Sequence, residues 1–296
     1  MKIAAPVEGT KAAATIGVVV PSYNYGRYLP ERLESIRQQD RPADALAFLD
    51  DASSDGSWAI AAPLLEGFAC RVVTRANTVN TGNVLRQWLA GVELLETELV
   101  WIAEADDRAA PGLLAALAPW LEADPEAALA FCDSAAIGGE GERIAADSQD
   151  YLAAYGDTAL ARNGSFTTAE FLDRFLCPRN LILSVSAVLW RRERLLAALR
   201  RMAAEAPLWL CAGDWRAYAE ICREPGSVHY VAAPLNDHRR HGGSVTRATP
   251  GAAHFSEVAA MHVHLREILG PEARRDAAMR RYLAELRRAW RLDAAA

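Results

Sequence analysis

The N-terminal third of the chain alternates short apolar runs with segments of helical periodicity, and this alternation restricts the possible folds more than any other feature. The apolar runs lie at residues 16–20, 46–49, 70–74 and 99–103, and helical spacing fills residues 27–39 and 82–95. Strands connected by helices form βαβ units, whose right-handed crossovers produce a mainly parallel sheet covered by helices on both faces. We therefore predict a three-layer α/β/α fold of the nucleotide-binding type.

The remainder of the chain shows weaker patterns and ends in helices. Further strands are expected at 127–132, 181–190 and 228–231, further helices from about 192 and 215, and a loop at 240–244. Residues 249–296 should form a C-terminal helical extension of one domain spanning residues 1–248. An apolar stripe in the last helix consists of Met279, Leu283, Leu286 and Trp290. This stripe should pack on its own domain, although a cationic helix of this kind could instead contact an anionic membrane or a partner.

Composition excludes several classes of protein. The 296 residues carry a net charge of −6 and their basic residues are scattered, so nucleic acid is not an expected partner. No apolar run approaches the roughly 20 residues of a membrane-spanning helix, and the N-terminus lacks an apolar signal segment. We therefore expect a cytoplasmic protein, possibly at the inner face of the membrane, that could be one domain of a longer chain. The five widely spaced cysteines should be free thiols.

Searches for familiar catalytic motifs exclude further classes. The chain has only two lysines, Lys2 and Lys11, so it contains no phosphate-binding P-loop, and no G-x-G-x-x-G follows the first strand. It also lacks the G-x-S-x-G and H-E-x-x-H motifs. These absences disfavour P-loop ATPases, dinucleotide-dependent dehydrogenases, serine hydrolases and zinc proteases.

Three carboxylates follow the strand predicted at 99–103, in the sequence Glu104-Ala105-Asp106-Asp107. Ligands of such sheets bind beyond the carboxyl ends of the strands. Clustered carboxylates are tolerated when a divalent cation neutralises them, and oxygen ligands suit Mg²⁺ or Mn²⁺ shared with substrate phosphates. The cluster therefore predicts a metal site for a diphosphate substrate. Alternatively, the carboxylates could cap the helix that follows.

A second acidic strand end is formed by Asp50 and Asp51. Carboxylates here could accept hydrogen bonds from a base N–H or a ribose hydroxyl, and Tyr23 offers a ring on which a base could stack. Alternatively, both aspartates could serve only as turn formers in the Ser- and Gly-rich loop after them.

Five short segments are each weak signals of function alone, but their order and spacing along the chain are specific when taken together. They are Val18–Asn24, Leu49–Ser57, Glu104–Asp107, Gly213–Trp215 and His238–Thr246. Together they resemble the motifs of family 2 glycosyltransferases with the GT-A fold, over about residues 15–246. Glu104 stands in place of the first Asp of the family's D-x-D metal motif. The stretch from Gly82 to Trp88 is similar to a branch of the family that makes bacterial surface polysaccharides.

The resemblance implies roles for individual residues on the donor side. The nucleoside pocket would be lined by Pro21, Ser22, Tyr23 and Asp51, with Asp51 bonding the base. Asp106 and Asp107 would hold Mn²⁺ or Mg²⁺ on the diphosphate, and His241 would add a metal or phosphate contact or be an ordinary loop residue. Glu104 would face the ribose or the donor sugar, and Arg86 would contact the donor.

The resemblance also implies that Asp214 is the catalytic base. An acceptor hydroxyl attacks an anomeric carbon efficiently when a carboxylate takes its proton, and a leaving diphosphate on the opposite face makes the reaction inverting. Alternatively, Asp214 could cap the helix expected from Trp215. Arg179 and Asn180 fall where the family places acceptor-side residues. Trp215 could stack on a glycan or lie in the core.

These expectations describe an inverting, metal-dependent glycosyltransferase. It would move a sugar from a nucleotide-sugar donor to a hydroxyl of a bacterial surface glycan or a lipid-linked precursor. The alternative is a glycosyltransferase-like module without turnover that serves as a binding or scaffold part of a larger assembly. The presence of both Asp107 and Asp214 favours the enzyme. A sugar nucleotidyltransferase would need a basic, Gly-rich loop after the first strand, which Pro21–Asn24 does not provide.

Overall fold

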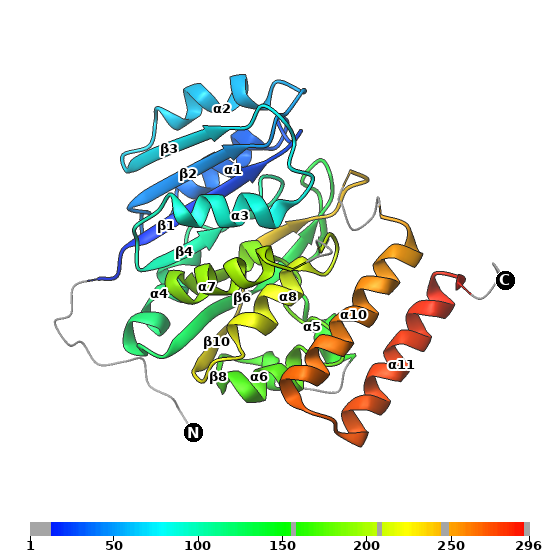
Figure 1. Cartoon of the computed structure of the whole chain (residues 1–296). Helices are drawn as coiled ribbons and strands as arrows, with labels where there is room; N and C mark the ends of the chain where they lie inside the picture. Colours follow the sequence, from blue (N-terminus) through cyan, green and yellow to red (C-terminus); the bar gives the residue numbers. More distant parts are fainter. Residues whose placement is uncertain (1–12, 155–157, 206–208, 244–248, 293–296) are drawn as a thin grey trace.

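A mixed β-sheet with helices on both faces makes up the computed structural model, which describes residues 13–154, 158–205, 209–243 and 249–292 (Figure 1). The strands are β1 (Ile16–Ser22), β2 (Ala45–Asp50), β3 (Arg71–Ala76), β4 (Leu99–Ile102), β5 (Arg108–Ala109), β6 (Ala127–Ile137), β7 (Arg143–Ala145), β8 (Gly164–Thr167), β9 (Val188–Arg191) and β10 (Ser227–Arg239). The α-helices are α1 (Leu29–Arg37), α2 (Ser57–Leu65), α3 (Val84–Glu93), α4 (Leu113–Ala123), α5 (Gln149–Ala153), α6 (Thr168–Phe175), α7 (Arg192–Ala203), α8 (Gly213–Ile221), α10 (Gly251–Leu269) and α11 (Ala273–Ala289). Short 3-10 helices are η1 (Ala159–Ala161) and η2 (Val185–Ala187).

The order of the strands places a change of direction in the N-terminal half of the sheet. The order is β3-β2-β1-β4-β9-β6-β10-β5, with β7 beside β6 and β8 beside β10. Strands β3, β2, β1 and β4 are parallel, as the alternation of strands and helices predicts. Strand β9 runs antiparallel to both of its neighbours, so the sheet is mixed beyond β4. The chain order reverses at β1, and such switch points open a crevice at the carboxyl ends of the strands.

The side chains of β1 alternate between two apolar cores, one on each face of the sheet. Val18 and Val20 pack into the core that contains residues of α1, α2 and α4, whereas Val19 packs into the core with residues of α3, α7 and α8. Successive side chains of a strand point to opposite faces, so a continuous apolar run is the pattern of a strand covered on both sides. Each fully buried valine contributes about 1.5–3 kcal/mol, and the two cores together hold the three layers in place.

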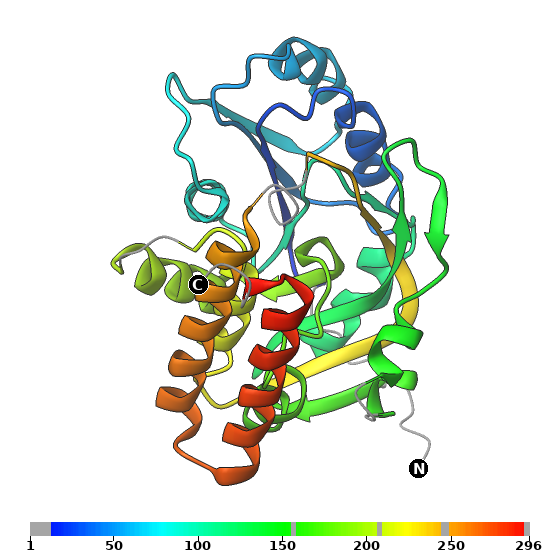
Figure 2. The same ribbon diagram turned by 90° about the vertical axis from the view of Figure 1, so that its right-hand side faces the viewer.

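The C-terminal helices α10 and α11 lie side by side and pack against the α8 face of the molecule (Figure 2). Val258 and Met261 of α10 are buried in the core shared with α8. From the apolar stripe predicted in α11, Met279 is buried, and Leu283 and Leu286 pack against the same core. The stripe therefore packs on its own domain. None of the helices in the described part of the chain combines the length and apolarity needed to cross a bilayer.

The strand predicted at 181–190 is wrong over most of its length. Only Val188–Arg191 is a strand, and it is preceded by the 3-10 helix Val185–Ala187. The side chain of Ser184 accepts a hydrogen bond from the backbone N–H two residues later, and its Oγ donates to Asp107 Oδ2 at 2.7 Å. Hydrogen bonds of this kind compete with the pairing of a β-ladder, and an apolar pattern does not reveal them.

The strand predicted at 228–231 continues much further, to Arg239. Its pairing with β6 is irregular on either side of Pro234, where the register shifts. Proline has no N–H to donate to a ladder, so it is accommodated at such irregularities. The extension matters for function, because it carries Arg239 to the carboxyl end of β4.

Gly91 on α3 provides a test of the packing between helix and sheet. A Cβ at this position would lie 2.3 Å from Val19 Cγ1 and 3.0 Å from Leu49 Cδ1. Gly91→Ala should therefore lower the free energy of unfolding by about 1–2 kcal/mol, since overpacking outweighs the gain in helix propensity. Urea denaturation measures the change. The control is Gly112→Ala, whose Cβ would lie 3.8 Å from its nearest neighbour, Asp40 Oδ2; equal stability of the two variants would contradict the packing.

Candidate active site

The candidate donor-side residues lie in the segments that follow β1, β2 and β4. The backbone N–H of Ala103 still donates to the carbonyl of Val19 at 2.8 Å, as a continuation of β4. The chain then turns, and the N–H of Asp107 donates to the carbonyl of Glu104 at 3.2 Å. Because of this turn, the three carboxylates of the acidic segment have different surroundings.

Asp106 and His241 form the pair best suited to hold a metal ion. Asp106 Oδ2 lies 3.0 Å from His241 Nε2. The Asp106 side chain is 15% exposed and the His241 side chain is 10% exposed. The rings of Tyr25 and Tyr28 contact the imidazole, with centroids 5.6 and 5.2 Å away. The described residues contain no group of three or more His, Cys, Asp or Glu side chains that could hold an ion. Mg²⁺ and Mn²⁺ commonly take only one or two protein ligands and complete their shell with water and substrate phosphates, so the pair fits such an ion.

Asp107 is buried, and both of its carboxylate oxygens are engaged by the protein. Oδ2 accepts a hydrogen bond from Ser184 Oγ at 2.7 Å, and Oδ1 accepts one from the backbone N–H of Arg239 at 2.8 Å. The family resemblance implied that Asp107 holds a metal together with Asp106. In the structure Asp106 lies against His241, and the bonds of Asp107 connect the end of β4 to β10 and to the segment before η2. A buried carboxylate needs partners of this kind.

Glu104 lies beside a tryptophan that the sequence analysis did not single out. Its Oε1 accepts a hydrogen bond from Trp88 Nε1 at 2.7 Å, and its backbone N–H donates to Ser186 Oγ at 3.1 Å. Burial, and next the neighbouring charge of Asp106, raise the pKa of Glu104 to about 8. A carboxyl group kept neutral in this way can donate a hydrogen bond to a ligand oxygen.

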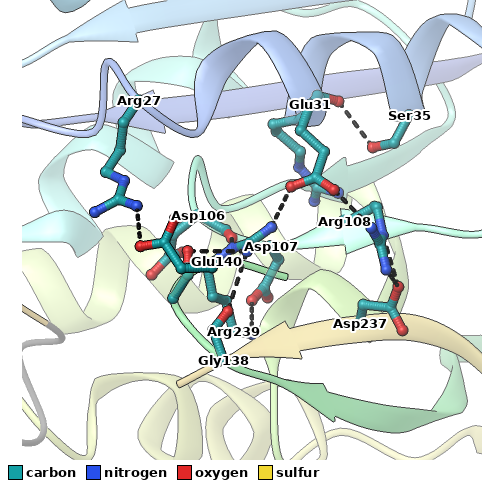
Figure 3. Close-up of polar contacts among 12 residues, drawn as sticks. Arg27, Glu31, Ser35, Asp106, Asp107, Arg108, Gly138, Glu140, Asp237 and Arg239 are labelled. Atoms are coloured by element: carbon teal, nitrogen blue, oxygen red, sulfur yellow. Dashed lines mark hydrogen bonds and ion pairs between the residues drawn. The ribbon is translucent and has the colours of Figure 1, made fainter. Parts of the chain in front are cut away.

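Arg239, the last residue of β10, connects the acidic segment to helix α1 (Figure 3). Its Nε donates to the carbonyl of Asp106 at 2.6 Å, its Nη1 donates to the carbonyl of Gly138 at 3.1 Å, and its Nη2 pairs with Glu31. The guanidinium lies 4.8 Å from the centre of the Tyr28 ring. Arg239 thus fixes the backbone of Asp106, one proposed metal ligand, and precedes the other, His241, by two residues.

Arg32 of α1 places a second cation near the acidic segment. It is fully buried, and its guanidinium lies 4.8 Å from the centre of the Trp101 ring. Burial lowers the pKa of Arg32 to about 10, against the opposing effect of carboxylates that include Asp107 and Asp106. The side chain is therefore charged at neutral pH and offsets part of the negative charge of the segment.

The residues predicted to line the nucleoside pocket lie at the adjacent ends of β1 and β2. Pro21 is buried within β1, and Tyr23 follows the strand with 47% of its surface exposed. Ser22 and Asp50 face each other in the register, and each has a buried side-chain oxygen without a hydrogen-bond partner, Ser22 Oγ and Asp50 Oδ1. Such groups are uncommon in folded proteins and call for an explanation, which donors from a bound base or ribose would provide.

Asp51, predicted to bond the base, is already engaged by the loop between β3 and α3. Its carboxylate accepts hydrogen bonds from Asn77 Nδ2 at 2.7 Å, from Thr81 N at 3.1 Å and from Thr81 Oγ1 at 2.7 Å. Asp51 therefore holds this loop in place. The neighbouring Asp50 is the carboxylate with an unpaired oxygen.

Asp214 is half-buried in the first turn of α8, which begins at Gly213 with Ala212 as its N-cap residue. The alternative that Asp214 itself is the N-cap is therefore wrong. Its Oδ1 accepts a hydrogen bond from the N–H of Trp215 at 2.7 Å, and its Oδ2 accepts one from Asn180 Nδ2 at 3.2 Å. Burial raises the pKa of Asp214 to about 6, although these hydrogen bonds oppose the shift.

Glu257 of α10 anchors the loop that leads into α8. Its carboxylate accepts hydrogen bonds from three consecutive backbone N–H groups, those of Leu210 at 3.0 Å, Cys211 at 2.8 Å and Ala212 at 2.8 Å. A carboxylate is stabilised by the unpaired N–H groups and the positive dipole end of a helix N-terminus. A residue of the C-terminal extension thus fixes the segment that carries Asp214.

The remaining predicted residues occupy different places around a pocket of about 420 Å³ that includes Asn180 and Asp214. Trp215 is buried at its edge, and its Nε1 donates to the carbonyl of Leu176 at 2.9 Å, as expected of a core residue. Arg179 is engaged by α11, as described below. Arg86 is exposed in the first turn of α3.

Sequence reasoning missed three residues of the site: Trp88, Arg239 and Glu257. Trp88 and Arg239 stood inside segments that had been recognised, but no pattern in those segments distinguished them from their neighbours. Glu257 carried no sequence signal, since a glutamate on a surface helix is an ordinary solvated residue. Residues 244–246, which end the motif segment His238–Thr246, lie outside the described residues.

Comparison with solved structures identifies the class of the fold. TarS residues 1–349 of S. aureus, in complex with UDP-GlcNAc, superposes with a TM-score of 0.63 at 16% identity, covering 86% of this chain and 70% of that one. Mannosyltransferase PcManGT from Pyrobaculum calidifontis, in complex with GDP-Man and Mn²⁺, gives a TM-score of 0.56 at 18% identity, covering 95% and 84%. The chain has the GT-A fold of these glycosyltransferases.

The sequence comparison identifies the family. A model of glycosyl transferase family 2 matches residues 17–172, more than half of the chain. The protein belongs to this family of glycosyltransferases. Abequosyltransferase RfbV of Salmonella typhimurium is 28% identical over 181 residues, which is 60% of this chain. The match spans 53% of the length of that relative.

The role of Arg239 can be tested by removing its charge. Arg239→Met should lower the free energy of unfolding by about 2 kcal/mol, because the carbonyls of Asp106 and Gly138 lose a donor while Glu31 keeps its pair with Arg108. The matched control is Arg240→Met at the exposed neighbouring position, which should change stability by less than about 0.5 kcal/mol. Chemical denaturation measures both, and a similar loss in the two variants would contradict the assignment.

Proposed function

We propose that the protein is a metal-dependent, inverting glycosyltransferase that moves a sugar from a nucleoside-diphosphate sugar to a hydroxyl of a bacterial surface glycan or its lipid-linked precursor. The nucleoside would lie at the ends of β1 and β2, the diphosphate at Asp106 and His241, and the acceptor hydroxyl at Asp214. One observation carries the proposal. Arg239 and Arg240, directly before His241, also line the pocket beside Asp214, which supports a single site for the candidate base and the candidate metal ligands.

A buried tyrosine supports the same conclusion. Tyr218 is stacked on Trp190, with ring centres 5.2 Å apart. Burial raises the pKa of Tyr218 well above its usual value, and the negative charges of Asp214 and Glu104 add to the shift. The candidate base and one carboxylate of the acidic segment therefore both influence the same side chain.

The names and bound ligands of similar proteins support the proposal. RfbV is named as an abequosyltransferase, TarS was solved with UDP-GlcNAc, and PcManGT was solved with GDP-Man and Mn²⁺. TarS and PcManGT differ in both nucleotide and sugar. The proposal for this chain is accordingly made at the level they share, a nucleoside-diphosphate sugar as donor.

Asp214 has the properties required of a general base. With a pKa near 6 it is ionised at neutral pH, yet it is more basic than an ordinary aspartate. Asn180 and the N–H of Trp215 each hold one of its oxygens and so orient the carboxylate toward an acceptor. Because the proton is taken on the acceptor side while the diphosphate leaves on the other, one displacement inverts the anomeric centre.

The donor side is proposed to divide its tasks among several residues. Asp106 and His241 would hold Mn²⁺ or Mg²⁺, which when bound stabilises the negative charge of the departing nucleoside diphosphate. Glu104 would face the ribose or donor sugar, and Arg86 would contact the donor from α3. Asp107 would keep this arrangement in place through Ser184 and β10 rather than touch the ion.

Metal dependence can be tested on the intact chain. A panel of UDP-, GDP- and CDP-sugars with Mn²⁺ or Mg²⁺ should show release of nucleoside diphosphate that EDTA abolishes. Asp106→Asn and His241→Ala should each weaken Mn²⁺ binding, titrated calorimetrically with the nucleoside diphosphate present, by roughly 10–100-fold. Asp107→Asn should mainly lower thermal stability. Release that persists in EDTA would contradict the metal site, and binding without any release would favour the module without turnover.

The pH dependence of kcat/KM tests the base. Protonation of Asp214 removes the base, so kcat/KM should fall about tenfold per pH unit below about pH 6 and level off above it. Glu257→Gln should move this limb to lower pH, because the negative charge of Glu257 raises the pKa of Asp214. Asn180→Ala should move it to higher pH, because a hydrogen bond to the carboxylate is lost.

A conservative substitution completes this test. Asp214→Asn should retain donor binding by calorimetry and lose transfer, since the amide cannot accept the proton. Transfer at the wild-type rate, or an acidic limb that stays in place in both neighbouring variants, would contradict the assignment of Asp214.

A further inference from the structure

Helix α11 carries arginines of two kinds, one directed to the domain and the other to solvent. Arg275 is of the first kind, and its Nε bonds Asp173 Oδ1 of α6 at 2.7 Å. The other arginines of the helix are all exposed, and they are Arg274, Arg280, Arg281, Arg287 and Arg288. A helix turns by about 100° per residue, so these positions fall within an arc of roughly 140°, with Ala277 and Ala284 between them. This set of five arginines is called the outward arc below.

The two acidic side chains within α11 lie at the borders of the outward arc, and both are engaged elsewhere. Asp276 pairs with Arg266 of α10 at 3.1 Å, and Glu285 pairs with Arg179 at 3.0 Å. Within the part of the chain that the structure describes, four arginines of the arc form no ion pair, and these are Arg274, Arg280, Arg281 and Arg288. The arc is therefore a concentration of uncompensated positive charge.

The opposite side of α11 is already used for packing. Met279 is buried, and Leu283 and Leu286 pack against the core shared with α8. The ring of Tyr282, on the same side, has its centre 4.2 Å from the guanidinium of Arg179. The apolar stripe is therefore not available to enter a bilayer, and only the charges of the outward arc remain for contact with a surface. Packing on the domain and contact with a membrane thus use different faces of one helix.

We propose that the outward arc binds the surface of an anionic lipid bilayer by electrostatic contact, without insertion of α11. The whole chain has a net charge of −6, so an anionic surface attracts it only where positive charge is concentrated. Clusters of about four to eight basic residues on one side of a helix are typical of sites that bind anionic lipid. Each arginine near such a surface strengthens binding by roughly fivefold, so several in one arc are enough for measurable docking.

Two observations favour lipid over nucleic acid as the occupant. The outward arc holds only arginine and alanine, with no aromatic ring on which a base could stack. Tyr282, on the inward side of the same helix, lines the pocket that contains Asp214. A bilayer at the arc would lie about one helix diameter, roughly 10–12 Å, from this wall of the pocket. That distance suits an acceptor anchored in the bilayer, and this step rests on the proposed function.

Flotation of the intact chain with lipid vesicles tests the docking. Vesicles of phosphatidylcholine with about 30% phosphatidylglycerol should bind the protein, and vesicles of phosphatidylcholine alone should not. Raising the salt concentration from about 0.05 M to about 0.5 M should release the protein, because screening weakens contacts between exposed charges. Binding to both kinds of vesicle at high salt would indicate insertion of apolar side chains and would overturn the proposal.

Substitutions locate the contact on α11. Arg281→Gln combined with Arg288→Gln removes two charges of the outward arc and should lower the partition coefficient on anionic vesicles roughly 25-fold. The matched control is Arg71→Gln combined with Arg75→Gln, which removes two exposed charges from β3 at the far edge of the sheet (Figure 1). The control should bind vesicles as the unchanged chain does. Thermal melts show that both variants are folded.

The outcomes keep the docking separate from the proposed function. Vesicle binding that is lost in the α11 variant and kept in the β3 variant confirms the docking, whether or not any sugar is transferred. Equal losses in the two variants, or no binding to any vesicle, overturn it, while transfer to a soluble acceptor would leave the function intact. A single-stranded oligonucleotide or polyglutamate that binds the arc more tightly than the vesicles overturns lipid as the occupant. Docking without transfer from any donor counts against the proposed function alone.

Discussion

Charge compensation at the end of β4 is the interaction on which the candidate active site depends. Three carboxylates in four residues would repel one another at a strand end, and two buried arginines from different elements offset them. Arg239 bonds the backbone of the acidic segment directly, whereas Arg32 acts through its charge alone. With the backbone held in this way, the side chain of Asp106 lies against His241, and the proposed cation would not have to order the loop first.

The two aspartates of the acidic segment show how neighbouring residues of one motif acquire different tasks. Asp107 is enclosed and satisfied by Ser184 and β10, and Asp106 retains partial exposure beside an imidazole. The same division appears after β2, where Asp51 organises a loop and Asp50 keeps an unpaired oxygen. In each pair one carboxylate has hydrogen bonds from distant segments on its oxygens and so connects parts of the fold, whereas the other makes fewer such bonds.

The parallel half of the sheet could be predicted because its signal is local. The apolar runs of β1, β2 and β4 are short, continuous and separated by helical spacing, so they specify strands buried on both faces. The segment at 181–190 was just as apolar, but it contains Ser184. The Oγ of this residue donates to the distant side chain of Asp107 and accepts from the backbone N–H of Ser186, and a 3-10 turn forms there in place of a strand. Pattern reasoning also underestimated β10, since Pro234 is accommodated by an irregular register.

The amino-acid sequence by itself determined the fold class and the family, and it supplied the carboxylates and the histidine of the candidate donor site. These depend on residue type and spacing along the chain. The tertiary structure alone decided that Asp106 rather than Asp107 meets His241, that Arg239 holds them, and that Glu257 anchors the loop of Asp214. Such contacts join segments separated by tens to hundreds of residues. Their geometry is set by how the sheet and helices pack, and no local pattern encodes it.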